Sequence, residues 1–383
     1  MQIRLTPVEQ RIQKKLAAAK HTSGSHSPSP AMLENAGVAM KHDFCYLSNP
    51  HATELFLRYF KKDFSSQKKL RNLIEHYPSQ NRALAEKLER VAGVPAKNIF
   101  VGNGATEIIQ AVLHTFAKRK ILVPVPTFSP YLEFAPQGVR TLQHKLQKKD
   151  FFRLNLKKLL EDVRKEGPDS VVIINPSNPD GGGTPTRELQ NLLVNLRRIP
   201  TVIVDESFSH LVGERIESVA PLVKRHPNLV VIKSMSKDFG IAGLRLGYAV
   251  MSEKRVSALL ERGYLWNVSG FGEYFLDLLN RRDFLQQYEQ ARLRAIRERD
   301  EFFKALQEVK GIRVYPSKAN MFLVELLNGM SAEDLMIALL VRHGIYVRTC
   351  YDKVGLKGEF IRVASRSGGE NVKLVRALKE VTE

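Results

Sequence analysis

The sequence has little cysteine and no long apolar run. Only Cys45 and Cys350 occur among 383 residues, too few for a disulfide framework, which is typical of a reducing compartment. No apolar stretch approaches the ~20 residues that a membrane span needs. The polar start MQIRLTPVEQRIQKKLAAAK also lacks the apolar segment of a secretory signal. We therefore expect a soluble cytoplasmic protein without a membrane partner.

Acidic residues are also in short supply. Lys and Arg number 59 against 40 Asp and Glu, a formal net charge of +19. Basic residues alternate with aromatics at 58–71 and 145–158, a pattern that would suit phosphate contacts with a nucleic acid. The other interpretation is two solvated faces whose aromatics point into the core. We favour the second and expect no nucleic-acid partner, while a positive field would attract a small anionic substrate.

The order of elements indicates a mainly parallel sheet. From about residue 98, short apolar runs alternate with helical patterns, and such runs are typical of strands buried on both faces. The expected strands are NIFVG, KILVPVPTF, SVVIINP, TVIVDES, NLVVIKS and LRLGYAVM. Strands that alternate with helices indicate an α/β sheet that is covered by helices on both faces.

The chain is long enough for two domains. Residues 1–42 are interpreted as an N-terminal arm that ends in the linker HTSGSHSPSP. A large domain is expected at 43–282, and a smaller α+β domain at 283–383. The small domain would start with a long charged helix at 283–308, add strands at IRVYPS, NMFLVEL, GIYVRTC and EFIRVAS, and close with a helix near 369–381.

Polar residues follow several of the expected strands. VGNGATE would start a helix, so the amides of Gly104, Ala105 and Thr106 are suited to hold a phosphate. Asn178 stands in the turn NPSNPDGG, and Asp205 ends the strand in VDESF. In open α/β sheets the ligand lies beyond the carboxyl ends of the strands, so these residues should meet at one edge.

The stretch SMSKDFGIAGLRLG places Lys237 among hydroxyls, bare backbone and a second cation. It resembles the S-x-S-K-x-x-G-x-x-G-x-R-x-G signature of fold-type I, pyridoxal-phosphate-dependent enzymes of the class I/II aminotransferase superfamily, and the resemblance extends over residues 43–383. It implies that Lys237 is joined covalently to the cofactor's aldehyde. Ser234, Ser236 and Arg245 would bind the cofactor's phosphate.

The resemblance also implies roles around the cofactor ring. Asp205 would pair with the pyridine nitrogen and, with Lys237, carry the catalysis. Asn178 would donate to the phenolic oxygen, and Phe128 would stack on the ring. Tyr77 matches a tyrosine that reaches the phosphate from a neighbouring subunit, which implies a homodimer. For Phe128 and Tyr77, plain core packing is the alternative.

The substrate residues come from the two ends of the chain. By the same resemblance Arg362 would hold the α-carboxylate, and Asn49 would lie near the substrate, although the segment lacks the family's usual glycine. Arg348 and Arg366 would add cationic groups for a substrate that bears both a carboxylate and a phosphate. They could equally be exposed ion-pair partners.

Two branches of the superfamily resemble this chain most: histidinol-phosphate aminotransferases and threonine-phosphate decarboxylases. Phe208 stands where transaminases commonly have a tyrosine that donates to the phenolic oxygen. The run VRTCYDKVGLKGEFIRVASRSGGEN is similar to the decarboxylase branch. Arg348 alone does not discriminate, because the aminotransferase branch also needs an arginine for phosphate.

The sequence therefore predicts a decarboxylase of O-phosphoserine or O-phosphothreonine that uses pyridoxal phosphate. An aminotransferase acting on a phosphorylated substrate is the alternative. A transcriptional regulator would need a DNA-binding domain, and the first 40 or so residues are too few for one. A basic arm that docks on an acidic partner is the third possibility, and its deletion should leave turnover intact.

Overall fold

The structure is a computed structural model that describes residues 3–23, 27–213, 215, 217–327 and 329–382. Its large unit contains a seven-stranded sheet of order β2-β8-β7-β6-β5-β3-β4, in which only β8 runs antiparallel to its neighbours. The strands are β2 (Ile99–Gly102), β3 (Lys120–Val125), β4 (Arg140–Lys145), β5 (Ser170–Ile174), β6 (Thr201–Asp205), β7 (Leu229–Ser234) and β8 (Gly247–Met251).

Helices cover both faces of this sheet, as the apolar strand pattern predicts. On β6, Val202 and Val204 face one core and Ile203 faces the other, because successive side chains of a strand point to opposite faces. The first face carries α3 (Pro50–Asp63), α5 (Asn81–Glu86), α9 (Leu156–Glu166), α10 (Thr186–Asn195) and α13 (Gly270–Leu278). The other face carries α7 (Gly104–Phe116), α8 (Pro130–Glu133) and α12 (Glu253–Leu260). The predicted α/β class is thus confirmed.

The small unit is built on a four-stranded antiparallel sheet of order β12-β13-β10-β9. Its elements are β9 (Ile312–Val314), β10 (Met321–Leu326), α15 (Ala332–His343), β12 (Arg348–Thr349), β13 (Phe360–Ala364) and α16 (Gly368–Thr382). The segment GIYVRTC, predicted as one strand, forms two. Its first half is β11 (Ile345–Tyr346), which pairs in parallel with β1 (His42–Asp43), while its second half joins the antiparallel sheet.

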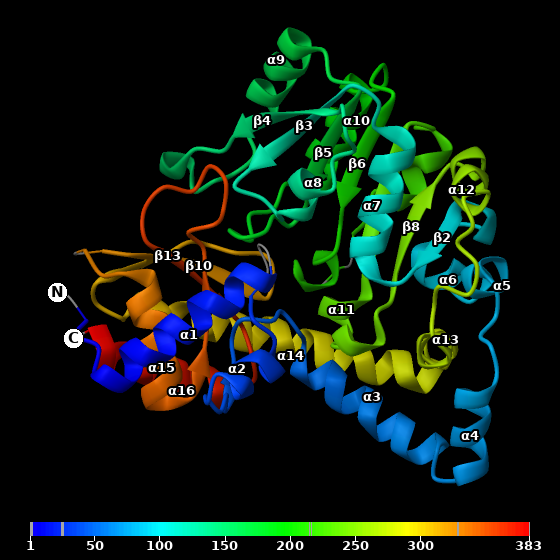
Figure 1. Cartoon of the computed structure of the whole chain (residues 1–383). Helices are drawn as coiled ribbons and strands as arrows, with labels where there is room; N and C mark the ends of the chain where they lie inside the picture. Colours follow the sequence, from blue (N-terminus) through cyan, green and yellow to red (C-terminus); the bar gives the residue numbers. More distant parts are fainter. Residues whose placement is uncertain (1–2, 24–26, 214, 216, 328, 383) are drawn as a thin grey trace.

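The long helix α14 (Arg282–Gln307) joins the two units. Phe284 and Tyr288 near its start pack in the large core, whereas Phe302 and Leu306 near its end pack in the small core. In Figure 1 this helix runs along the lower part of the molecule from one unit to the other. The charged helix that the sequence predicts at 283–308 is therefore confirmed as the connection.

The N-terminal segment packs against the small unit instead of projecting as an arm. Helix α1 (Pro7–Ser23) lies against α15, where Glu9 forms an ion pair with Arg342 at 2.6 Å. Leu16 of α1 and Leu33 of α2 (Pro30–Asn35) are part of the small core. Part of the predicted linker, residues 24–26, lies outside the described residues. A deletion of residues 1–40 would thus remove core side chains, so it cannot be expected to leave turnover intact.

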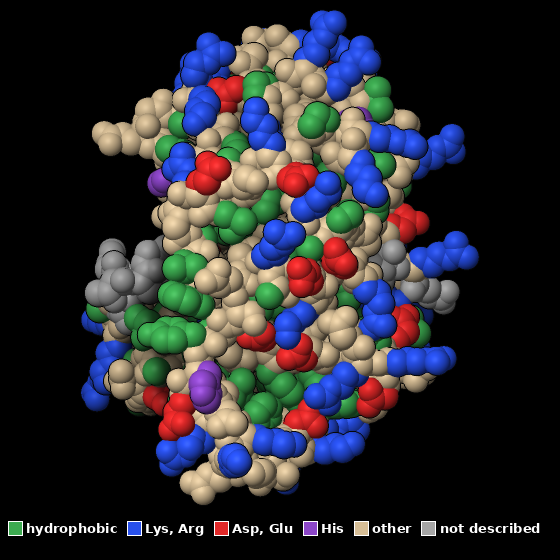
Figure 2. All heavy atoms as spheres, turned by 90° about the vertical axis from the view of Figure 1, so that its right-hand side faces the viewer, with side chains coloured by type: hydrophobic (Ala, Val, Ile, Leu, Met, Phe, Trp, Pro, Cys, Tyr) green, Lys and Arg blue, Asp and Glu red, His purple; other side chains and the backbone are tan. Residues whose placement is uncertain are grey.

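The basic run at 58–71 has its aromatics packed inward, as the second interpretation of the charge predicts, whereas in the run at 145–158 Phe152 is buried and Phe151 is 47% exposed. Phe60 and Phe64 pack together at 4.8 Å between ring centroids, and both lie against Tyr274. Lys and Arg side chains are spread over the face in Figure 2, with Asp and Glu between them. The run covers the end of α3 and α4 (Gln67–Glu75).

The remaining short elements connect these parts. They are α6 (Glu89–Ala92), η1 (Ala96–Asn98), η2 (Lys148–Asp150), η3 (Ser209–Leu211), η4 (Ala220–Lys224), α11 (Met235–Asp238) and η5 (Ala242–Leu244). Within the parts of the chain that the structure describes, none of the helices has the length and apolar character to cross a membrane.

The packing of α1 predicts that two of its apolar residues contribute differently to the stability of the protein. Leu16 is 4% exposed and Val8 is 60% exposed. Replacing Leu16 by Ala should lower the free energy of unfolding by about 2–4 kcal/mol because it leaves a cavity in the core. The matched change Val8→Ala should stay within about 0.5 kcal/mol. Urea unfolding followed by circular dichroism measures both, and equal stability of the two variants would contradict the docking of α1.

Candidate active site

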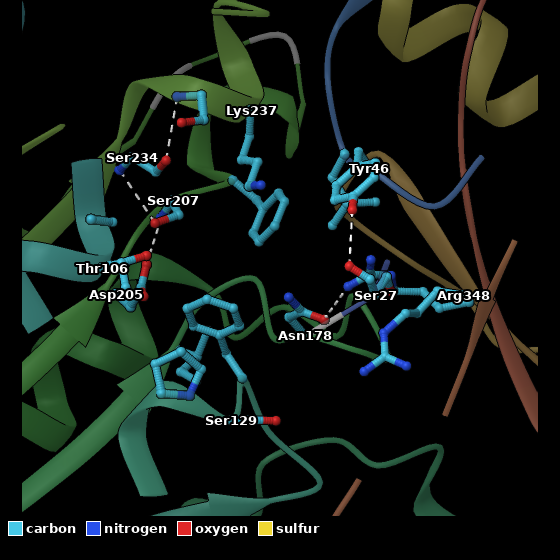
Figure 3. Close-up of a pocket in the computed structure, with 18 of the residues that line it drawn as sticks. Ser27, Tyr46, Thr106, Ser129, Asn178, Asp205, Ser207, Ser234, Lys237 and Arg348 are labelled. Carbon is cyan, nitrogen blue, oxygen red and sulfur yellow. Dashed lines mark hydrogen bonds between the residues drawn. The ribbon is translucent and has the colours of Figure 1, made fainter. Parts of the chain in front are cut away.

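The predicted polar residues meet at one cavity beyond the carboxyl ends of the parallel strands. The cavity has a volume of about 380 Å³, and residues of both units line it. Asp205 comes from the end of β6, Asn178 from the turn after β5, and Lys237 from the helix after β7. Figure 3 shows these three residues on different sides of the cavity. The cavity therefore lies at the carboxyl edge of the sheet, where the sequence predicts that these residues meet.

Lys237 stands on the single turn α11, at the cavity wall. The Ser234 hydroxyl caps this turn by accepting from the Ser236 amide at 3.3 Å. The Lys237 amine is half-buried and forms no hydrogen bond with any residue that the structure describes. Burial, together with the charges of Arg362 and Arg245, lowers the pKa of Lys237 to about 8. A lysine with a lowered pKa has a reactive neutral amine near physiological pH, which suits it as a nucleophile toward an aldehyde.

A phosphate cradle lies where β2 passes into α7. Gly104 has φ +80, and a Cβ there would come within 2.5 Å of Nη2 of Arg245, so glycine lets the guanidinium approach the backbone. Ala105, Thr106 and Ser236 line the cavity beside Arg245. The first amides of a helix have no intrahelical partner and carry a partial positive charge. Together with a guanidinium and hydroxyls they suit a phosphate dianion.

Asp205 is a buried carboxylate held by two donors. Its Oδ1 accepts from the Ser207 amide at 2.9 Å, and its Oδ2 accepts from the Tyr131 hydroxyl at 2.8 Å. Burial raises the pKa of Asp205, and the hydrogen bonds from Ser207 and Tyr131 oppose that rise. This carboxylate can therefore stay charged and pair with a cationic N–H in the cavity.

Arg362 reaches the cavity from β13 and is held by neutral oxygens. Its Nη1 donates to Oδ1 of Asn178 at 3.0 Å, and its Nη2 donates to the Cys45 carbonyl at 2.7 Å. Its Nε has no partner among the described residues, and no carboxylate of those residues lies within salt-bridge distance. The contact with Asn178 joins the small unit to the large one, and it leaves the positive charge of Arg362 unpaired. Phe128, half-buried, also lines the cavity.

Four of the predicted site residues lie outside the cavity lining: Gly104, Asn49, Arg366 and Tyr77. Asn49 caps α3 and bonds to the backbone of Lys237 and Asp238, so it positions the lysine from behind. Arg366 donates to the Ser48 carbonyl at 3.3 Å and lies 3.6 Å from Glu370, outside the cavity lining that the structure describes.

Tyr77 is 81% exposed and packs against Trp266 at 5.2 Å, away from the cavity of its own chain. That it reaches a neighbouring subunit's cofactor stays a prediction. Arg348 does line the cavity, and it pairs with Asp352 at 2.5 Å.

Sequence reasoning missed several residues of the site. Tyr131 is buried and donates to Asp205; it lies in α8, three positions after Phe128 in VPTFSPY, a segment that follows β3. Lys353 and Ser129 are buried, line the cavity and are joined by a hydrogen bond of 2.7 Å. The signal for Lys353 is its place in the basic run that starts at Arg348. The other missed lining residues include Ser27, Tyr46 and Ser207.

Comparison with known proteins agrees with this geometry. The family model for aminotransferase class I and II matches residues 52–381. The chain therefore belongs to the aminotransferase class I and II family, whose fold-type I architecture its two units reproduce.

Its relatives include decarboxylases of one amino acid phosphate. It is 46% identical to an L-serine phosphate decarboxylase of Campylobacter jejuni, over 100% of this chain and 99% of that protein. It is 42% identical to an L-serine phosphate decarboxylase of Sulfurospirillum multivorans, over 97% and 96% of the two chains. A solved decarboxylase structure from Sulfurospirillum multivorans superposes with a TM-score of 0.90 at 41% identity, covering 98% and 99%. The histidinol-phosphate aminotransferase of Clostridium acetobutylicum superposes with a TM-score of 0.78 at 29% identity, covering 89% of this chain and 98% of that one.

Removal of the Tyr131 hydroxyl tests the support of Asp205. In Tyr131→Phe the carboxylate loses a donor to its charged form, so the pKa of Asp205 should rise further. We expect the dissociation constant of pyridoxal phosphate to increase about 5- to 10-fold. The loss of affinity should be larger at low pH, because Asp205 of the variant becomes protonated at a higher pH than in the wild type. Titration of the apoenzyme, followed by absorbance, measures this constant.

Tyr264→Phe is the matched control. Tyr264 packs on Phe100 at 5.3 Å, and its hydroxyl makes no hydrogen bond with a described residue. If both variants bound the cofactor as the wild type does, the Tyr131 hydroxyl would have no role at the site.

Proposed function

We propose that this protein is a pyridoxal-phosphate-dependent decarboxylase that converts O-phosphoserine to O-phosphoethanolamine and carbon dioxide. The observation that carries the proposal is its similarity, over almost the whole chain, to two L-serine phosphate decarboxylases. The geometry of the cavity supports it on three independent points: the cofactor set, the charge and the position of Lys237.

The residues around the cavity fit pyridoxal phosphate. Lys237 supplies the amine for the aldehyde, and Asp205 supplies the partner of the pyridine nitrogen. The phosphate set consists of Arg245, the hydroxyls of Ser234 and Ser236, and the amides of Gly104, Ala105 and Thr106. Asn178 and Phe128 would contact the ring. When bound, the cofactor withdraws the electrons that a broken bond leaves at Cα.

The charge of the cavity fits a substrate with several negative groups. Its described lining holds five cations, Lys237, Arg245, Arg348, Lys353 and Arg362, and one carboxylate, Asp205, while Asp352 outside the lining pairs with Arg348. A phosphate monoester carries a charge of about −1.5 to −2 near neutral pH, and the substrate adds a carboxylate. Cofactor and substrate together thus bring enough negative charge to balance the lining. A neutral amino acid would leave much of the positive charge buried without a partner.

Arg362 is placed to bind the carboxylate that leaves, and Lys237 is placed to protonate Cα afterwards. Arg362, with its planar fork, suits the α-carboxylate and can set its orientation. Which bond at Cα breaks depends on that orientation. As the carboxylate carbon leaves as carbon dioxide, Cα must receive one proton, and the Lys237 amine, with its pKa of about 8, is the donor at hand.

Phe208 also favours decarboxylation over transamination. It is 3% exposed, lines the cavity and packs with Leu47, Met321 and Ala364, so it brings no hydroxyl to the ring. An aminotransferase acting on a phosphorylated substrate remains the second candidate, because a histidinol-phosphate aminotransferase has the same architecture at 29% identity.

We further propose a homodimer in which Tyr77 reaches the partner's cofactor phosphate. Tyr77, Trp266 and Leu265 are 81%, 46% and 54% exposed, and Tyr77 packs on Trp266. Large apolar side chains that gather at one surface are typical of an interaction site. Cys45 and Cys350 are both free thiols, which is compatible with the proposed cytoplasmic location.

Turnover of O-phosphoserine without a keto acid tests the proposed function. The cofactor-loaded enzyme should release carbon dioxide and O-phosphoethanolamine in equal amounts over many turnovers. Lys237→Ala should lose at least about 1,000-fold in kcat, because both the covalent attachment and the proton donor are gone. Carbon dioxide trapping and phosphorus NMR measure the products. Conversion of the cofactor to its amine form, with no carbon dioxide, would instead establish an aminotransferase.

A further inference from the structure

Two cations at one end of the cavity differ in how their charge is balanced. Arg348 is paired with Asp352 at 2.5 Å, so a carboxylate already offsets much of its charge. Lys353, one residue further along, is 8% exposed and has no carboxylate of the described residues within salt-bridge distance. Among the described residues its ammonium donates to the Ser129 hydroxyl, at 2.7 Å. A buried ammonium held by one neutral hydroxyl is a costly arrangement unless an anion joins it.

The Lys353–Ser129 contact bridges the two units over the cavity. Lys353 belongs to the loop between β12 and β13, and Ser129 belongs to the loop after β3. The lysine loop is packed tightly there: Gly355 has φ +85, and a Cβ on it would lie 3.0 Å from Val125 at the end of β3. The loop that carries Lys353 is thus held against the end of β3, and the Ser129 hydroxyl fixes the position of the ammonium, as a binding group requires.

The cations form a series along the cavity, with Lys237 between two anion-binding ends. Burial lowers the pKa of Lys237 and of Lys353, and the charge of Arg362 adds to this in both cases. The charge of Arg245 also lowers the pKa of Lys237, and the charge of Arg348 lowers the pKa of Lys353. Figure 3 agrees, with Thr106 and Ser234 on one side of Lys237 and Arg348 on the other. The Arg245 end takes the cofactor phosphate, so the Lys353 end is left for a second anion.

We infer that Lys353 and Ser129 form the subsite for the phosphate of the substrate's side chain, while Arg362 takes its carboxylate. This inference rests on the proposed function and assigns a residue to the part of the substrate that distinguishes it from serine. Lys353 donates to phosphate oxygens as a point charge, and Ser129 donates its hydroxyl to the same group. The phosphate then supplies the direct ion pair that no described carboxylate forms with Lys353, because the neighbouring Asp352 pairs with Arg348.

Binding of the product separates this subsite from catalysis. O-phosphoethanolamine carries the phosphate and lacks the carboxylate, so its affinity for the holoenzyme reports on the phosphate end. Lys353→Met keeps an unbranched apolar side chain and removes the ammonium with its charge. We expect it to weaken O-phosphoethanolamine binding about 10- to 100-fold by calorimetry, and to lower kcat/KM for O-phosphoserine by a similar factor. Lys353→Arg should recover part of both.

Lys357→Met is the matched control, because Lys357 lies on the same loop and is exposed. It should bind O-phosphoethanolamine as the wild type does. If Lys353→Met also bound it within about 2-fold of the wild type, a difference under ~0.5 kcal/mol, the inference would be overturned while carbon dioxide release could still establish the decarboxylase.

The proposed reaction can also be refuted while the proposed subsite stands. A wild type that binds O-phosphoethanolamine through Lys353 but releases no carbon dioxide from O-phosphoserine would keep the subsite and refute the reaction. Should Lys353→Met not fold, Ser129→Ala provides the second variant. It removes the neighbouring hydroxyl and should weaken product binding several-fold; unchanged binding would overturn the subsite.

Discussion

Uncompensated positive charge in one cavity is the constraint on which the rest of the structure depends. Buried cations elsewhere in the described chain have carboxylate partners: Lys233 lies 3.2 Å from Asp238, and Arg292 lies 2.7 Å from Glu289. In the cavity, Arg362 is held by a carbonyl and an amide oxygen, and Lys353 by a hydroxyl. Neutral acceptors fix the position of a cation without cancelling its charge. The cavity therefore keeps its charge for its ligands.

The fold supplies what such a cavity needs, a rigid wall and a second unit to close it. Parallel strands bring Asp205 and the lysine turn to one edge, and apolar residues on both faces of the sheet hold that edge in place. The small unit contributes the remaining cations from β12, β13 and the loop between them. Two contacts join the units across the site, Arg362 with Asn178 and Lys353 with Ser129. The two side chains that join the units across the cavity, Arg362 and Lys353, are thus also two of its cations.

Much of the fold and of the cofactor site could be predicted from the sequence, because local patterns determine them. Buried strands have continuous apolar runs, and polar residues just after them must meet at one edge. Lys237, Asp205 and Asn178 stand in such places, and the structure brings them together. The long helix could be predicted for the same reason, since its apolar and charged positions recur with helical spacing.

The parts that were missed depend on contacts between distant segments. Nothing near Tyr131 in the sequence indicates that its hydroxyl reaches Asp205, 74 positions away. Arg366 is two residues beyond the strand that holds Arg362, but the chain leaves the cavity there and its guanidinium turns to Ser48. Helix α1 looks like a free arm because few of its residues are apolar, and its docking depends on Leu16 and on an ion pair with a helix more than 300 residues later.

The central claim is that this cavity breaks the bond from Cα to the carboxylate and leaves the Cα–H bond intact. Its most direct test is turnover, in heavy water, of O-phosphoserine that carries carbon-13 in its carboxylate, followed by NMR. The account predicts labelled carbon dioxide and O-phosphoethanolamine with one deuteron at Cα. Deuterium at Cα of recovered O-phosphoserine, with the label still in its carboxylate, would mean that the Cα–H bond breaks first and would contradict the account.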